Sequence, residues 1–202
     1  MRRAIPIRLP AALALGLLLA GCAAHAPLPP PAAGDRPLVA LLPLENLSGH
    51  AEYTDRLTQV VWTEMGRSPL WEVVDPGEME AALSDARVRS SLAMTREQMQ
   101  KLTKRTGARW LMAGTIVECG LVRTPDGEVP TLALALRLLD GETGRVRWTE
   151  LRTRSGEDRE TVFGWGRVTN LERLAQGTAR ELIEAVRLPA APDSLAPGGS
   201  SR

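Results

Sequence analysis

Leu132-Ala133-Leu134-Ala135-Leu136-Arg137-Leu138 is the stretch that decides the fold. Leucine occupies every second position, and the residues between the leucines are two alanines and one arginine. Successive side chains of a strand point to opposite faces, so this pattern predicts a strand with one leucine face. The small residues on its second face would let a helix lie close.

Two further strands are expected beside this one. Asp140–Gly144 is a loop of hairpin length, and it leads into a partner strand from Arg145 to about Thr153. Trp110–Val117 is apolar and predicts a deeply buried strand upstream. We expect a loop from Glu118 to Pro130 between the buried strand and the leucine strand. The three strands then form an antiparallel meander.

The N-terminal half alternates strands with helices. Leu38–Pro43 is a continuous apolar run, which is typical of a strand buried on both faces, and Trp71–Val74 predicts a second, short strand. Helices are expected over Glu52–Gly66, after the N-cap Asp75, after the capping box at Thr95 with the staple residues Met94 and Met99, and over Thr169–Leu188. The fold class is therefore α/β: a mixed sheet with an antiparallel C-terminal meander and helices packed on it.

The N-terminus has the composition of an export signal. Arg2, Arg3 and Arg8 precede an Ala- and Leu-rich run from Leu9 to Ala20, which is too short to span a bilayer permanently. Leu19-Ala20-Gly21 before Cys22 resembles the lipobox of bacterial lipoproteins. The resemblance implies removal of residues 1–21 and lipidation of Cys22, which would anchor the chain in a membrane. Ala23 in place of Asp points, by the same resemblance, to the outer membrane.

The remaining chain divides into three parts. Residues 22–36 form a Pro- and Ala-rich tether, which reaches roughly 40 Å when it is extended. Residues 37–188 are expected to form a single α/β domain, and residues 189–202 form a tail rich in Ala, Pro, Ser and Gly that we expect to be disordered.

The charge balance argues against nucleic acid as a partner. The chain holds 25 basic and 24 acidic residues, and the signal peptide removes three of the arginines. No basic stripe is left to bind phosphates. Lipidation of Cys22 would leave Cys119 as the last free thiol, so no intramolecular disulfide is expected.

Catalytic and cofactor motifs find little support in the sequence. His50 is the only histidine outside the tether, and no Gly-x-Ser-x-Gly elbow presents a serine. Cys119 and His50 do not have the spacing of zinc ligands. Gly164-Trp165-Gly166 lacks the third glycine of a dinucleotide loop. We therefore expect no enzyme activity, no cofactor and no metal.

Protein-binding residues are sought in the loops. Trp62, Trp71, Trp110 and Trp148 lie on periodic elements, where core packing is the default. Phe163 and Trp165 lie in a polar, Gly-bearing loop, either buried beneath it or exposed as a partner-binding anchor. Asn46 and His50, in the turn after the first strand, complete the candidate set.

Four stretches together resemble the TolB-N-terminal-like domain of bacterial envelope lipoproteins, a group that includes CsgG and LpoB. They are Val39–Gly49, Thr106–Thr115, Leu136–Gly144 and Trp148. The resemblance implies an outer-membrane lipoprotein, with its domain in the periplasm, that binds another envelope protein as an assembly or regulatory factor. A ring-forming subunit of a secretion or envelope-spanning complex and a periplasmic small-ligand binder are the alternatives. The expected Glu118–Pro130 loop is too short to supply the amphipathic segments of a CsgG-like pore.

Overall fold

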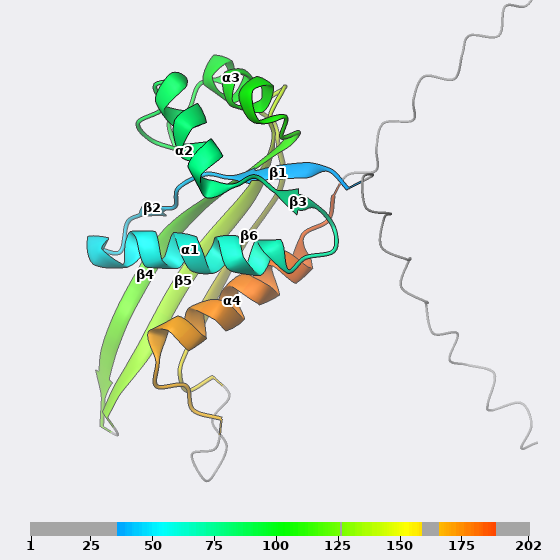
Figure 1. Ribbon diagram of the computed structural model, residues 1–202. Coiled ribbons are helices and arrows are strands. Elements are labelled where there is room, and N and C mark those ends of the chain that lie inside the picture. Colours follow the sequence, from blue (N-terminus) through cyan, green and yellow to red (C-terminus); the bar gives the residue numbers. More distant parts are fainter. Residues whose placement is uncertain (1–35, 126, 159–165, 189–202) are drawn as a thin grey trace, which may run out of the picture. The chain divides into compact units, whose positions relative to one another are not determined.

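The computed structural model describes residues 36–125, 127–158 and 166–188. Their order is strand, helix, strand, two helices, three strands and helix, with a two-residue strand and a 3-10 turn after the first strand. Six strands form one mixed sheet whose path is β3-β1-β4-β5-β6, and β2 also pairs with β4. The predicted α/β class with an antiparallel C-terminal meander is confirmed (Figure 1).

The meander is longer than the sequence indicated. It consists of β4 (Trp110–Thr124), β5 (Gly127–Asp140) and β6 (Val146–Ser155). The loop expected from Glu118 to Pro130 is wrong, because these residues extend β4 and β5 and pair with one another. The register of the β4–β5 pairing shifts between Ile116 and Glu118. Such an irregularity changes the direction of the strand that follows it, here the distal half of β4.

The strands before the meander pair in parallel. β1 (Leu38–Leu41) lies between β3 (Glu72–Val73) and the first residues of β4. β2 (Glu45–Asn46) was expected as part of a turn, yet it pairs with Thr115 and Ile116 farther along β4. Pro43 ends β1, but the chain continues along the same edge of β4 and resumes pairing two residues later.

Helices cover both faces of the sheet, and the figures show where they lie. α1 (Thr54–Gly66) and α4 (Leu171–Ala185) pack on the face that carries the leucine row of β5. Each of those four leucines is at most 2% exposed. α2 (Pro76–Asp85) and α3 (Arg96–Thr106) pack on the opposite face near β1 (Figure 1).

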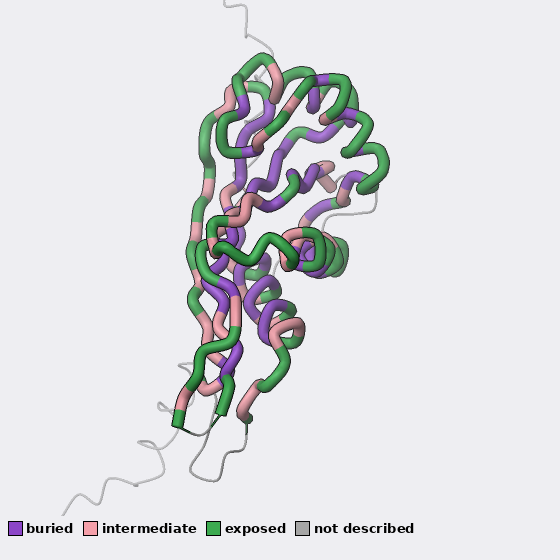
Figure 2. Tube along the Cα trace, turned by 90° about the vertical axis from the view of Figure 1, so that its left-hand side faces the viewer, coloured by how far each residue is buried: buried purple, intermediate pink, exposed green. Residues whose placement is uncertain are grey.

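On the second face, α2 and α3 pack near β1 and the start of β4. The core beneath them includes Ala113 and Leu139 but neither Ala133 nor Ala135, so the helix expected close to those two alanines does not belong to this cluster. The distal ends of β4 and β5 carry exposed residues, as the burial colours show (Figure 2).

Local sequence signals explain where the helices begin and how the tryptophans are used. Asp75 accepts from the amides of Gly77 and Glu78, and Thr95 forms a complete capping box with Gln98. Both predicted caps are confirmed. The four tryptophans expected in the core pack there: Trp71 and Trp110 are buried, and Trp62 and Trp148 are partly buried against the same cluster.

Asp140 holds the turn between β5 and β6. Its carboxylate accepts from the Thr143 amide at 2.8 Å and pairs with Arg147 at 3.2 Å. Burial by itself raises the pKa of Asp140, but the hydrogen bonds from Thr143 and the Arg147 charge outweigh it, so the pKa lies below its ordinary value. The charged form therefore stabilises the folded hairpin.

Replacing Asp140 tests this arrangement. Asp140→Ala should lower the free energy of unfolding by about 1 kcal/mol at neutral pH, because it leaves the part-buried Thr143 amide and the Arg147 guanidinium without their acceptor. The Asp140 carboxylate makes its full contribution to the free energy of unfolding above the pKa that it has in the unfolded chain. This contribution is lost as the pH falls through the lower pKa that the carboxyl group has in the folded protein. Urea unfolding between pH 7 and pH 2 should show a larger loss of stability in the wild type than in Asp140→Ala, and the difference between the two proteins reports Asp140. Glu142→Ala, at an exposed position of the same turn, is the control and should leave the profile unchanged.

Candidate functional site

Exposed apolar side chains gather beside the distal half of β4. Seven large hydrophobic residues of the described chain are exposed, and four of them lie here: Leu47 at 66%, Leu121 at 53%, Val117 at 46% and Val122 at 44%. Leu47 follows β2, and its amide donates to the Ile116 carbonyl at 2.8 Å, which places it beside Val117. We call these four residues the distal surface. Leu121 and Val122 are successive strand residues whose side chains point to opposite faces of the sheet, so the four residues do not form one continuous face. Exposed apolar side chains near one another are candidates for protein binding.

The turn that presents Leu47 is built around Asn46. The Asn46 side-chain amide donates to the His50 carbonyl at 2.8 Å and to the Thr54 hydroxyl at 3.0 Å. Its carbonyl oxygen accepts from the Ser48 amide at 3.0 Å and from the Ser48 hydroxyl at 2.7 Å. The Asn46 side chain therefore fixes the turn, and Leu47 is the residue that projects from it. Its predicted role as a partner contact stays a prediction.

His50 lies at the edge of the same region with its ring exposed. Its Nδ1 atom lies 3.3 Å from a carboxylate oxygen of Glu52, and its ring is tilted against Tyr53 with the centroids 6.0 Å apart. A Cβ atom added to Gly120 would lie 3.6 Å from His50 Nε2, so the ring rests against the bare backbone of β4. The structure thus brings His50 and Asn46 together next to the distal surface.

A groove of about 260 Å³ adjoins the distal surface. Tyr53, Leu121 and Leu171 belong to its apolar lining. Its rim carries the pair formed by Arg56 and Glu172, which joins α1 to α4 at 2.7 Å. Leu121 therefore belongs both to the distal surface and to the groove, where a partner side chain would contact apolar side chains and the charged rim.

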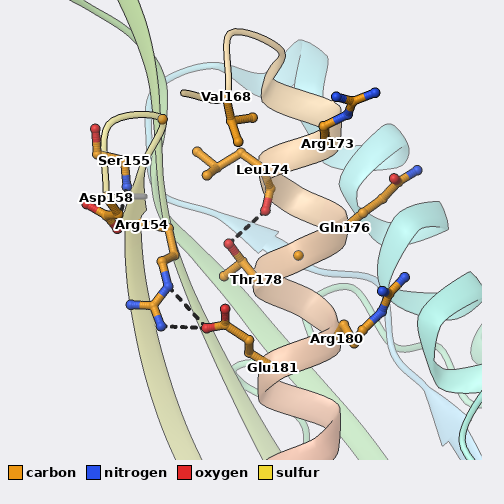
Figure 3. A pocket seen from close by; sticks show the side chains of 12 residues that line it. Arg154, Ser155, Asp158, Val168, Arg173, Leu174, Gln176, Thr178, Arg180 and Glu181 are labelled. Carbon is orange, nitrogen blue, oxygen red and sulfur yellow. Dashed lines mark hydrogen bonds and ion pairs between the residues drawn. The ribbon is translucent and has the colours of Figure 1, made fainter. Parts of the chain in front are cut away.

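A second hollow lies between the end of β6 and α4, and it is the natural place to test for a small ligand (Figure 3). Its polar groups are largely engaged with one another. Arg154 pairs with Glu181 at 2.5 Å, the Thr178 hydroxyl donates to the Leu174 carbonyl at 2.8 Å, and Arg180 reaches Glu64 at 3.2 Å. This hollow does not present a converging set of available hydrogen-bonding groups.

Cys119 is buried, and the remaining predicted site residues lie at undescribed positions. Cys119 is 3% exposed and lies within β4. Burial, with a smaller effect of the Glu52 carboxylate, raises the pKa of its thiol to about 11. Cys22, Phe163 and Trp165 lie outside the described residues. In the described ranges there is no group of three or more His, Cys, Asp or Glu side chains arranged for a metal, and no helix there has the length and apolar character to cross a membrane.

The burial of Cys119 predicts slow chemical modification. At pH 8 a thiol reagent should label the folded protein far more slowly than protein unfolded in denaturant, because only the exposed thiolate reacts. Thr149→Cys, at an exposed position on β6, provides a matched control and should label rapidly in the folded state. Equal labelling rates for both thiols would contradict the burial of Cys119.

The distal surface was not identified from the sequence, although a signal was present. Leu121 and Val122 are apolar residues within the stretch interpreted as a loop. Val117, Val122 and Val129 are of a residue type favoured in strands. A strand continuing past Glu118 would have placed them at the sheet edge.

Comparison with known proteins gives fold likeness alone. No family model matches the chain, and no curated protein matches it. Lipoprotein GNA1162 from Neisseria meningitidis is similar with a TM-score of 0.52 and 14% identity, covering 74% of this chain and 99% of that one. A PelC dodecamer from Paraburkholderia phytofirmans has a TM-score of 0.50 and 18% identity, over 73% and 87% of the two chains. The hypothetical protein CT253 from Chlamydia trachomatis has a TM-score of 0.50 and 13% identity, over 74% and 94%. The chain thus has a fold that occurs in a bacterial lipoprotein.

Proposed function

We propose that this protein is a non-enzymatic envelope lipoprotein, anchored in the outer membrane, that binds another envelope protein as an assembly or regulatory factor. The observation that carries the proposal is the distal surface, four exposed apolar side chains of which Leu121 also lines the groove between α1, α4 and β4. Exposed clusters of this kind lose apolar contact with water when a partner covers them. The binding energy is expected to concentrate in Leu47 and Leu121.

The location rests on the N-terminus and on the fold. The lipobox-like Leu19-Ala20-Gly21-Cys22 supports lipidation, and Ala23 supports the outer membrane over the inner one. The fold likeness to lipoprotein GNA1162 agrees with an envelope protein. The closer relation to TolB-N-terminal-like proteins of the CsgG and LpoB type is part of the proposal, and it is supported by the four sequence stretches that suggested it.

A binding role also fits the chemistry of the one turn that holds a serine and a histidine. The Ser48 hydroxyl donates to the Asn46 side chain, and the His50 ring lies beside Glu52 rather than beside that hydroxyl. A serine nucleophile needs its hydroxyl to donate to a base. These groups stabilise a loop, and the loop presents Leu47.

The proposal predicts that a charged side chain on the distal surface weakens binding of the partner protein. Leu47→Asp and Leu121→Asp should each reduce crosslinking to the partner in intact envelopes about fivefold or more, because a hot-spot side chain is worth more than ~1 kcal/mol. Both positions are exposed, so the thermal midpoint should stay close to that of the wild type.

Leu92→Asp is the matched control, because Leu92 is 44% exposed but lies outside the distal surface. Cys22→Ala tests the anchor in the same experiment. If Leu92→Asp reduced crosslinking as much as Leu47→Asp, the distal surface would not be the binding site.

A ring-forming subunit is the second candidate, and one finding favours it. The PelC protein that shares this fold was crystallised as a dodecamer. We therefore predict that, if this chain also forms a ring, the full-length lipoprotein in detergent will sediment as one large species of fixed subunit number. A species of one or two subunits across a hundredfold range of concentration would exclude the ring.

A further inference from the structure

β6 is a long strand with one open edge. It contains ten residues, and among the described residues it pairs only with β5. At the opposite end of the sheet β3 has only two residues, and the indole of Trp62 donates to the neighbouring Val74 carbonyl at 3.2 Å. Short, covered edges resist pairing with other chains, whereas a long open edge offers a row of backbone groups.

The direction of these backbone groups follows from the ladder. The Gly156 amide donates to the Pro130 carbonyl across the β5–β6 pair, whereas the Ser155 amide points away and donates to Asp158. Antiparallel strands alternate in this way from one residue to the next. The register between Thr131 and Leu138 has no irregularity, so the amide and carbonyl groups of Thr149, Leu151 and Thr153 face the open edge.

The side chains along this edge have a self-complementary order. Around Leu151, Glu150 stands on one side and Arg152 on the other, and Thr149 and Thr153 follow at equal distances. An antiparallel pair of two such strands centred on Leu151 places each Glu150 opposite an Arg152 of the second copy. It also places Thr149 opposite Thr153, the positions whose backbone groups face outward. The charged side chains and the outward-facing backbone groups are therefore both matched in the antiparallel register centred on Leu151.

We propose that two copies of this chain pair through their β6 edges, antiparallel and with Leu151 opposite Leu151. In the single chain Glu150 and Arg152 form an ion pair within the strand, and the dimer exchanges it for two pairs between strands. In the single chain the Arg154 guanidinium donates to the Thr153 carbonyl at 3.2 Å. In the dimer a backbone amide of the second copy replaces the guanidinium as the donor to this carbonyl.

The charges on β6 also disfavour the register centred on Thr153. A pair centred on Thr153 would place Arg152 opposite Arg154, and like charges directly opposite each other are destabilising. Edge charges often prevent strand pairing altogether. Here Glu150 and Arg152 lie symmetrically about Leu151, so the charges favour the pairing centred on that residue.

This dimer is independent of the proposed function. A two-fold pair closes on itself, whereas a ring requires two different surfaces on each subunit. Leu47 and Leu121 do not belong to the β6 edge, so the distal-surface variants and the β6 variants test separate claims.

Cysteine crosslinking of the full-length lipoprotein in detergent tests the register. Leu151→Cys should form a disulfide-linked dimer under mild oxidation, because residues opposite each other in this pairing have Cα atoms about 5.5 Å apart. Thr149→Cys is equally accessible, but each Thr149 lies opposite Thr153 and not opposite its own copy. It should crosslink at most weakly alone, and efficiently when mixed with Thr153→Cys. The buried Cys119 does not interfere.

Exchanging the charges of Glu150 and Arg152 provides a second test, which can be interpreted even if a cysteine variant folds poorly. Glu150→Arg and Arg152→Glu should each weaken dimerisation roughly tenfold in sedimentation experiments, since two cross-strand pairs turn from attractive to repulsive. The double variant E150R/R152E restores opposite charges and should restore the dimer. The proposal is overturned if the wild type stays monomeric at 100 µM or about that concentration, if Leu151→Cys and Thr149→Cys crosslink equally, or if the double variant fails to recover.

Discussion

Burial of the leucine row on β5 is the constraint on which the rest of the structure depends. Leu132, Leu134, Leu136 and Leu138 lie at the centre of the sheet and pack under α1 and α4. A shift of one residue in the pairing of β5 would turn all four leucines to the other face, so their burial fixes the register of the whole meander. Gly114 shows how tightly this layer is packed, because a Cβ atom there would lie 2.7 Å from Leu136 and 2.4 Å from Leu44.

The parts of the fold that depend on local chemistry could be predicted from the sequence. The alternation of β5, the cap at Asp75 and the capping box at Thr95 each arise from neighbouring residues, and the structure contains all of them. β2 could not be found in this way, because its two residues form a strand only through pairing with Thr115 and Ile116. The distal half of β4 was missed for a related reason: its side chains are exposed, so the buried-strand pattern stops before the strand does.

The candidate site shows the same division. The turn that contains Asn46 and His50 was recognised from its residue types, which favour turns, and both residues lie in its hydrogen-bond network. The apolar residues that form the distal surface were overlooked because exposure depends on which elements cover a strand, and that is a property of the tertiary structure. The same applies to the open edge of β6. The order of the charged residues along β6 can be read from the sequence. Only the sheet topology shows that no described strand lies beside this edge.

The ion pairs between α1 and α4 have a consequence for when the chain can complete its fold. Arg56 with Glu172 and Glu64 with Arg180 join residues that are 116 positions apart, and α4 completes the cover of the leucine row. The core therefore cannot close until the last helix is available. A chain threaded N-terminus first through a translocation channel would stay unfolded, and hence able to pass, until nearly its whole length had emerged. For a lipoprotein exported as proposed, completion of the fold would be coupled to the end of transport, and folding before export would be slowed for as long as α4 is still being synthesised.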